Sequence, residues 1–369
     1  FKYLTKFLTT NIFLVVSFFI VVVINNGSFL NPYTYKSSSY IWSIGFLYIG
    51  VYIGKEIRVI KSFLLFVVLY FFYLYVYAVN DFPSAVIELI SSISDKYEPH
   101  KGSDILIMLI IPLLVANRIC KNRRTSLNIL LLSSALFLPL LLYKSRGAFI
   151  TFLIFVILEI YILRKNLKST IQSNSIIFIL FSIIFLLSSF IVTQREIRID
   201  EVSGTVTELA TYRIPDKNAK FNPIFLSEGR LYSSDSNLNW RLQIWQDVIT
   251  DMSQNNIFLT GYGFNEKIPA MNDPLRAGDD GLNENIHNFL LNVFARGGLI
   301  HFTLYVYLVF QIIKLLKNIY LDNSNLSIVF PVLLASLFDA SMENAHFPII
   351  FYFFIGIFMH KEKLFKNRI

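Results

Sequence analysis

Residues 140–153 read LLLYKSRGAFITFL, where two apolar runs are separated only by Lys144, Ser145 and Arg146. The runs extend outward in both directions, over about 126–143 and 147–163. Each approaches the ~20 residues that an α-helix needs to cross a hydrocarbon core ~30 Å thick. We therefore expect the chain to cross a membrane, reverse within a few residues and cross back, as polytopic α-helical membrane proteins do.

The composition of the whole chain agrees with this class. Of 369 residues, 54% are hydrophobic and 16% are charged, with a mean hydropathy of +0.55, whereas about a quarter of the residues in a soluble protein are charged. We predict an all-α polytopic membrane protein with about ten transmembrane helices and one large external loop. The apolar runs lie at about 11–25, 40–54, 62–80, 104–120, 126–143, 147–163, 174–193, 298–316, 326–341 and 346–360.

The positions of lysine and arginine predict the orientation. With the amino end inside, the cytoplasmic segments carry 18 of these cations and the short loops on the other side carry five. Cytoplasmic loops are enriched in Lys and Arg, so the net charge of +8 indicates contact with anionic membrane lipids rather than with nucleic acid. Cys120 is the only cysteine, which excludes an internal disulfide and a cysteine-based metal site.

The amino end resembles a signal peptide only superficially. Lys2 and Lys6 precede an apolar run, but no cleavage-site pattern follows, so we predict a first transmembrane helix. The chain begins with Phe1 rather than Met, and we therefore expect a truncated amino end.

The long polar segment 194–284 is predicted to lie outside the cytoplasm. It carries nine basic and fourteen acidic residues, unlike a cytoplasmic loop, and connections of this length are commonly functional. Within it, 239–252 is predicted to form an amphipathic helix whose apolar face consists of Leu242, Trp245, Val248 and Ile249. The stretch NIFLTGYG at 256–263 then predicts a chain reversal, because its glycines are typical of helix ends.

His287 lies where this segment returns to the membrane, in NENIHNFLLNVFARGG at 283–298. If the helix begins near Asn283 or Asn285, which are good N-cap residues, the histidine lies in its first turn. The positive end of the helix dipole disfavours imidazolium, and a neutral imidazole can act as a general base. The alternative is an interfacial histidine whose ring lies at the depth of the lipid headgroups.

Two arginines are candidates for binding an anion. Arg146 lies between two spans, where an ionisable group is costly and is by default a functional candidate; the alternative is an arginine that anchors the helix ends. Arg241 lies between Trp240 and Trp245, where it could point into a cavity or be an ordinary solvated charge. A guanidinium suits bidentate binding of phosphate. Three other loop arginines have less context and are predicted to be solvated charges: Arg213, Arg230 and Arg276.

Acidic residues offer a weaker hypothesis. Asp279, Asp280 and Glu284 could hold a divalent cation, since hard cations prefer carboxylate oxygens, but their spacing matches no established loop and a solvated acidic turn is favoured. Glu343 and His346, in the last external turn, could line a cavity mouth or be ordinary polar loop residues.

Four motifs together resemble the superfamily of O-antigen ligases and O-antigen polymerases, which are bacterial envelope glycosyltransferases. They are S-R-G-A at 145–148, R-L-Q-I-W at 241–245, G-Y-G at 261–263 and H-N-F-L-L-N-V-F-A-R-G-G at 287–298. The resemblance covers roughly 126–360, including three spans after the large loop. Seven spans precede that loop here, whereas the ligases usually have about nine.

The resemblance implies a fold and a reaction. It implies a GT-C-type architecture and the inverting transfer of a glycan from undecaprenyl diphosphate to an acceptor hydroxyl, without a metal ion or other cofactor. Arg146 and Arg241 would bind the donor diphosphate, and His287 would be the catalytic base. The acceptor would be either lipid A core or another carrier-linked glycan. Possible accessory residues are Arg213, Arg230, Asn288 and Glu284.

We accordingly expect three parts: N-terminal transmembrane helices at 1–125, a ligase-like domain at 126–360 that includes the loop at 194–284, and a cytoplasmic tail at 361–369. The implied location is a bacterial inner membrane, with the active site facing the periplasm. Two alternatives remain open. One is a transporter or flippase for lipid-linked oligosaccharides, although we find none of the repeated halves common in transporters. The other is a metal-dependent glycosyltransferase that uses Asp279 and Asp280.

Overall fold

The computed structural model describes residues 2–55, 63–79, 89, 92, 102–119, 123–163, 175–199, 224–227, 229–276, 283–319, 324–338, 341–343 and 345–359. The chain divides into two compact units. Unit 1 comprises Phe1–Trp42, Ile199–Gln311 and Ser336–Ala345, and unit 2 comprises Ser43–Arg198, Ile312–Ala335 and His346–Ile369. Arg241 and His287 therefore belong to unit 1, and Arg146 belongs to unit 2.

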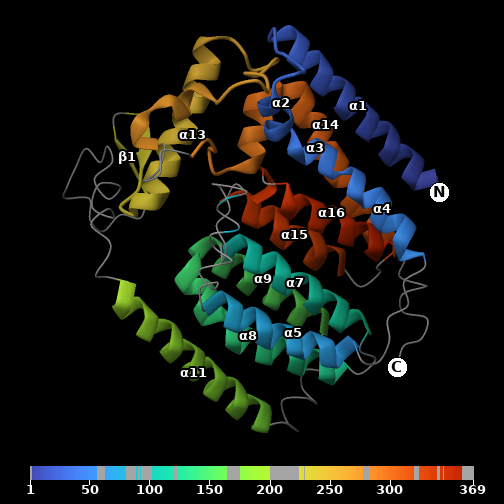
Figure 1. The fold of residues 1–369 in the computed structure, drawn as a ribbon, viewed down its shortest axis with the longest axis vertical. Helices are drawn as coiled ribbons and strands as arrows, with labels where there is room; N and C mark the ends of the chain where they lie inside the picture. The colour runs from blue at the N-terminus through green and yellow to red at the C-terminus, as the bar shows by residue number, and fades with distance from the viewer. Residues whose placement is uncertain are drawn as a thin grey trace. The chain divides into compact units, whose positions relative to one another are not determined.

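Unit 2 consists of apolar helices (Figure 1). Helices α5, α7, α8 and α9 pack against one another, and α4 packs along α16. Gly50 of α4 and Gly356 of α16 allow that approach, because a Cβ atom at either position would collide with the main chain of the opposite helix. The helices of unit 2 are α4 (Gly45–Gly54), α5 (Phe63–Val79), α7 (Gly102–Ile119), α8 (Arg123–Lys144), α9 (Arg146–Leu163), α16 (His346–Phe358) and most of α11 (Ser175–Ile199) and α15 (Ser324–Ser336).

The predicted all-α membrane class agrees with these helices. Within the described residues, five helices are long and apolar enough to cross a membrane: Thr5–Ile24, Arg124–Lys144, Arg146–Leu163, Ile176–Thr193 and Phe289–Ile319. Five further apolar helices are shorter, at Ser39–Gly54, Phe66–Val79, Gly102–Asn117, Ser327–Ser336 and His346–Phe358. Each of the ten predicted apolar runs thus contains a helix, while the crossing of a membrane by all ten stays a prediction.

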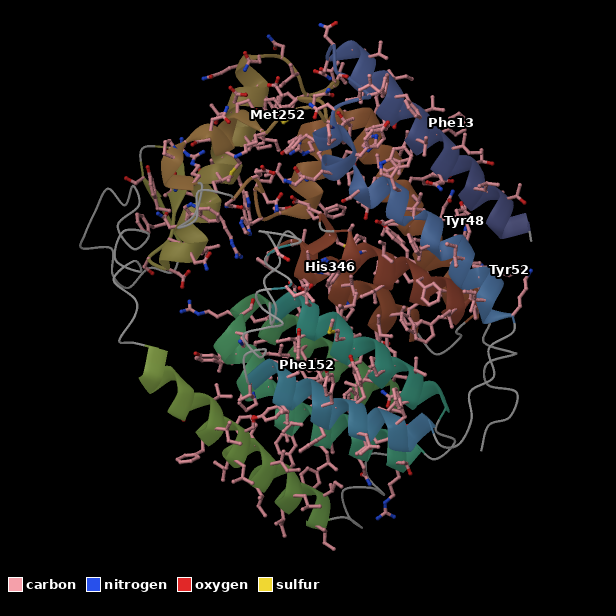
Figure 2. All side chains as sticks on the ribbon, in the orientation of Figure 1. Phe13, Tyr48, Tyr52, Phe152, Met252 and His346 are labelled. Atoms are coloured by element: carbon pink, nitrogen blue, oxygen red, sulfur yellow. The ribbon has the colours of Figure 1, made fainter. Side chains whose placement is uncertain are left out.

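The exposure of large apolar side chains fits a lipid environment. Phe152 of α9 is fully buried within unit 2, whereas Phe13 of α1 in unit 1 is 58% exposed (Figure 2). Along α11, Phe178, Leu186 and Phe190 are also exposed. Exposed apolar surface on this scale is unusual in a soluble protein and indicates contact with a membrane or a partner.

Unit 1 contains the residues of the polar segment 194–284 that are described from 224 onward, together with parts of the chain on either side of it. Its elements are α1 (Lys2–Ile24), α2 (Pro32–Ser37), the start of α3 (Ser39–Ser43), strands β1 (Phe225–Ser227) and β2 (Arg230–Tyr232), α13 (Ser236–Gln254), α14 (Phe289–Ile319) as far as Gln311, and 3-10 turns at Pro269–Asn272, Pro274–Arg276 and Ser341–Glu343. His301 ties three of these helices together. Its fully buried ring lies 2.7 Å from Ser17 Oγ on α1 and 2.6 Å from Tyr40 Oη on α3.

The β1–β2 hairpin is attached to α13 by glutamine side chains. The N–H of Leu231 donates to Gln246 Oε1 at 2.7 Å. The carbonyl of Leu231 accepts from Gln243 Nε2 and from Gln246 Nε2, each at 2.9 Å. Because the donor and the acceptor of this residue are both satisfied by α13, the hairpin is fixed on the polar side of that helix.

The predicted helix over 239–252 is confirmed, but its predicted apolar face is partly wrong. Helix α13 starts three residues earlier, at Ser236, where Asp235 caps it by accepting from Leu238 N–H at 2.9 Å. The buried stripe is Trp240, Ile244, Val248 and Met252, at intervals of four residues. Of the predicted face, Val248 is fully buried, Leu242 and Trp245 are half-buried, and Ile249 is 41% exposed.

The predicted reversal over 256–263 is also confirmed, and it fixes a break in α14. The N–H groups of Tyr262 and Gly263 donate to the carbonyls of Ala295 and Arg296, and Leu299 N–H donates to Phe258 O. The two helical parts of α14 meet at Gly298, whose φ is 71°, a conformation that favours glycine. The reversal at 256–263 is therefore hydrogen-bonded to α14 on both sides of its break at Gly298.

Candidate functional site

His287 lies just outside α14. The helix begins at Phe289, and its N-cap is Asn288, whose Oδ1 accepts from Leu291 N–H at 3.0 Å. The prediction that the helix begins near Asn283 or Asn285 is therefore wrong, because the third asparagine of the segment takes the capping role. His287 has a φ of 52°, in the left-handed region that non-glycine residues seldom adopt. Such conformations persist only where the surroundings fix them.

Three contacts fix the histidine and its backbone. The ring nitrogen Nε2 of His287 lies 3.2 Å from Asn283 Oδ1. The indole of Trp240 meets the imidazole edge-on, with ring centroids 5.1 Å apart. One residue before the histidine, the carbonyl of Ile286 accepts a hydrogen bond from Trp245 Nε1 at 2.8 Å. We call Trp240, Trp245, Asn283 and His287 the histidine corner.

Arg241 lies beside the histidine corner in sequence. It follows Trp240 on α13, and its side chain is half-buried. The Trp240 side chain itself is 8% exposed, and its Nε1 has no hydrogen-bond partner among the described residues. Buried polar groups are normally satisfied, and this donor lies in the same side chain that contacts the imidazole of His287.

Further along α13, Asp247 is the centre of a network of charges. Asp247 accepts from Arg230 Nη2 at 2.6 Å and from Arg276 Nη2. Arg276 is 2% exposed and also donates from Nη1 to Ala270 O at 2.8 Å, while Arg230 Nε donates to Gln243 Oε1 at 3.1 Å. We call Arg230, Asp247 and Arg276 the Asp247 network.

The pKa of Asp247 reflects its two cations. Burial alone would raise the pKa of this carboxyl, but hydrogen bonds and charge from Arg276 and Arg230 outweigh burial and lower it below its ordinary value. The carboxylate is therefore held ionised. Arg230 and Arg276, predicted to be solvated, are instead paired within the protein.

The described residues give no support to the predicted metal site. Glu284 is ion-paired with Lys36 and lies 3.9 Å from Lys267 Nζ, so two ammonium groups face its carboxylate. Arg213, Asp279 and Asp280 lie outside the described residues. Within the described parts of the chain, no group of three or more His, Cys, Asp or Glu side chains is placed to hold a metal ion.

Arg146 belongs to unit 2. It is the exposed first residue of α9, which Ser145 caps by accepting from Ala148 N–H at 3.3 Å. Gly102, the first residue of α7, packs so closely on Ser145 that a Cβ atom there would collide with it. This bears out the prediction that S-R-G-A opens a helix directly after a reversal. The convergence of Arg146 with Arg241 and His287 stays a prediction.

The turn before α16 contributes residues to both units. Glu343 belongs to unit 1, where its carbonyl accepts from Ser39 Oγ at 2.8 Å. His346, labelled in Figure 2, begins α16 in unit 2, and its Nε2 lies 2.9 Å from Asp104 Oδ1 on α7. A shared cavity mouth for these two residues stays a prediction.

Two members of the histidine corner could not be recognised from the sequence as partners of His287. Trp240 contacts it from 47 positions away along the chain, and no periodicity signals such a contact. Asn283 is four residues before His287, a spacing that suggests contact in a helix, but this stretch is not helical. The structural role of Arg296, which is not part of the histidine corner, could not be recognised from the sequence either. This arginine is 3% exposed and donates to Asn292 Oδ1, Glu266 O and Tyr33 Oη, each at 3.0 to 3.1 Å.

Residues 129–306 match a protein-family model described as O-antigen ligase. The match contains all four motifs and confirms the resemblance to O-antigen ligases and polymerases, over a shorter range than the predicted 126–360. It supports a membrane enzyme of the ligase or polymerase type. No curated protein and no solved structure gives a significant match to the chain.

Proposed function

We propose that this chain transfers a glycan from an undecaprenyl-diphosphate carrier to an acceptor hydroxyl, with inversion at the anomeric carbon and without a metal ion. The observation that carries the proposal is that the histidine corner, with Arg241 beside it, lies within the segment matched by the O-antigen ligase family model. The proposed location is a bacterial inner membrane with the site facing the periplasm, in a GT-C-type architecture.

The reaction assigns one role to each of three residues. The acceptor hydroxyl gives its proton to His287 as its oxygen attacks the anomeric carbon. The bond from that carbon to the carrier diphosphate breaks, and its electron pair leaves with the diphosphate. Arg146 and Arg241 bind the diphosphate and stabilise the charge that develops on it, which is the usual role of preorganised cations in group transfer.

The proposed reaction requires no acidic residue at the leaving group. A lipid diphosphate is already stable as an anion, whereas glycosidases protonate a sugar oxygen with a carboxylic acid. This agrees with the pairing of Glu284 to two lysines. The product distinguishes the two kinds of acceptor, because a ligase attaches the glycan to lipid A core and a polymerase lengthens the carrier-linked glycan.

The test is complementation of a host strain whose own copy of this gene is deleted, with surface glycan as the readout. We expect His287→Ala to accumulate in the membrane at the wild-type level and to lose transfer by about a hundredfold or more, as removal of a general base does. His346→Ala is the matched control, because it removes another histidine of the external side. Wild-type transfer by His287→Ala would overturn the proposal.

Two measurements on purified protein separate the alternatives. Product formation in detergent, where there is no second compartment, is expected of an enzyme and not of a transporter or flippase. Transfer that survives EDTA is expected from the metal-free mechanism. Loss of transfer in EDTA that added Mg²⁺ or Mn²⁺ restores would instead favour a site containing Asp279 and Asp280.

A further inference from the structure

The orientation of the Asn283 side chain is fixed by two main-chain groups. Its Nδ2 lies 3.1 Å from the carbonyl of Arg276, which can only accept a hydrogen bond. Its Oδ1 lies 3.2 Å from the N–H of Asn285, which can only donate. The amide therefore has a single arrangement that satisfies both neighbours, with oxygen toward Asn285 and nitrogen toward Arg276.

The same oxygen faces the ring of His287. Because Oδ1 of Asn283 can only accept, the Nε2 atom that lies 3.2 Å from it must carry a proton. A neutral imidazole has one N–H, and the hydrogen bond made by one ring nitrogen decides which nitrogen keeps the lone pair. The lone pair of neutral His287 is therefore on Nδ1.

We propose that Asn283 is a positioning residue that holds His287 as the Nε2–H tautomer, so that Nδ1 is the atom that takes the proton of the acceptor hydroxyl. The inference rests on the proposed function for the role of Nδ1 as a base, but the tautomer itself is a property of the protein alone. In the reaction, the acceptor O–H bond breaks, its proton binds Nδ1, and Nε2 keeps its hydrogen bond to Asn283. The resulting imidazolium then releases the proton from Nδ1 to water.

The arrangement also explains how a strained residue is kept in place. The side chain of Asn283 holds the ring, the Trp245 indole holds the preceding carbonyl of Ile286, and Trp240 packs against the imidazole. The charged groups on α13 are Arg241, Asp247, which is paired with Arg230 and Arg276, and Asp251, which accepts from Tyr262 Oη. On the segment of His287 itself the charged group is Glu284, which is paired with Lys36 and Lys267. The first turn of α14 has no acidic residue.

The tautomer is tested directly by ¹⁵N NMR of the ring nitrogens in the detergent-solubilised full chain, with the His287 signals assigned by their loss in His287→Gln. We expect Nδ1 to resonate as a lone-pair nitrogen and Nε2 as a protonated one. In Asn283→Ala both tautomers should be populated. Asn285→Ala is the matched control, because it keeps the main-chain donor to Asn283 and should leave the His287 spectrum unchanged.

Activity provides the second readout. Asn283→Ala should lower the transfer rate about tenfold, as the loss of one orienting hydrogen bond does, with little change in the donor concentration at half-maximal rate. Asn283→Asp places a carboxylate against Nε2–H, which favours imidazolium. Since the base must be neutral, the acid limb of its pH–rate profile should move to higher pH, by about one unit.

The outcomes separate this inference from the proposed function. A wild-type spectrum with the proton on Nδ1, or an unchanged spectrum in Asn283→Ala, overturns the inference even if His287→Ala loses all transfer. An unshifted pH profile in Asn283→Asp also overturns it. Wild-type transfer by His287→Ala overturns the function, whatever tautomer the spectrum shows.

Discussion

Helix α13 carries two polar clusters of opposite character. In the Asp247 network, the carboxylate is matched by two guanidinium groups, and both arginines also bond to neighbouring oxygens. In the histidine corner, His287 has a left-handed backbone, and the buried Nε1 of Trp240 has no hydrogen-bond partner among the described residues. Charges matched in this way are typical of a structural role, whereas strained or unsatisfied groups concentrate at functional sites.

The two clusters are connected through Arg276. Its guanidinium belongs to the Asp247 network, and its carbonyl accepts from Asn283 Nδ2, which in turn orients His287. The network therefore supports the segment from which the histidine is positioned. The position of His287 thus depends on an ion pair in which the histidine takes no part, and we expect the two clusters to respond differently to substitution.

The largest effect is expected at Arg241. Arg241→Lys keeps the charge but removes the planar fork that binds a diphosphate in bidentate fashion, so transfer should fall about a hundredfold while the thermal midpoint stays near that of wild type. Arg230→Lys is the matched control from the Asp247 network. It should lower the thermal midpoint and leave transfer per molecule of folded protein near that of wild type.

Both measurements are made on the same detergent preparations, with unfolding followed by tryptophan fluorescence. Near-wild-type transfer by Arg241→Lys would mean that Arg241 acts as a point charge or takes no part. A strong loss of transfer in stable Arg230→Lys protein would give that arginine the accessory role suggested by the resemblance. The Asp247 network would then not be purely structural.

The next largest effect is expected at Asp247. Asp247→Ala removes the carboxylate shared by Arg230 and by Arg276, which is 2% exposed. It should lower the free energy of unfolding of unit 1 by about 3 kcal/mol. Because Arg276 also orients Asn283, transfer should fall as well. Val248→Ala leaves a cavity on the same helix and controls for a general loss of stability. Transfer by Asp247→Ala and Val248→Ala is compared at temperatures at which the two variants are equally folded. Equal transfer by both would show that the Asp247 network does not support the histidine corner.

The pH dependence of stability gives a related test. The folded pKa of Asp247 lies below its ordinary value, so its contribution to stability is complete above the unfolded pKa, which is about 4. It is lost as pH falls through the folded pKa. The stability of wild type should therefore begin to approach that of Asp247→Asn as the pH falls below about 4. The two should meet below the lower folded pKa, where both proteins carry a neutral group at this position. A gap that stays constant with pH would contradict the charged pairing.

The sequence predicts the helices well where a local signal decides them. The boundary between α8 and α9 is set by Ser145, a good N-cap separated from the preceding apolar run only by Lys144. The start of α14 is missed because Asn283, Asn285 and Asn288 are all good caps, and only the fold selects the last of them. Similarly, the apolar residues of α13 fit two overlapping stripes, and packing selects the one that contains Ile244 and Met252.

The candidate site is predictable only in part. His287 is recognised because a titratable group stands where a membrane helix is about to begin, and Arg241 because it lies between Trp240 and Trp245. The contact of Trp240 with His287 joins distant parts of the chain, and the role of Asn283 depends on a backbone conformation of the 283–288 segment that no short-range pattern encodes. Sequence therefore identifies the chemical groups, and the structure identifies what orients them.

A smaller effect is expected at Trp245. Trp245→Phe keeps an aromatic ring on α13 but removes the donor to Ile286 O, which should lower the free energy of unfolding by about 1 kcal/mol. The carbonyl it releases belongs to the residue before His287, so transfer should also fall, by about tenfold at most. Thermal unfolding and the transfer assay measure both effects. An unchanged thermal midpoint would mean that this hydrogen bond does not hold the segment.

The smallest effect on stability is expected at Trp240, the other tryptophan of the histidine corner. Trp240→Phe keeps a ring against the imidazole and removes a buried N–H that has no partner among the described residues. Removing an unsatisfied N–H costs no hydrogen bond, so Trp240→Phe loses only the packing of the buried ring atoms that it removes. Its free energy of unfolding should therefore fall less than that of Trp245→Phe. A loss as large as that in Trp245→Phe would show that the Trp240 N–H is satisfied within the protein. The two tryptophans, five residues apart on one helix, would then both donate a hydrogen bond from the indole N–H, and Trp240 would not be an unsatisfied group of the histidine corner.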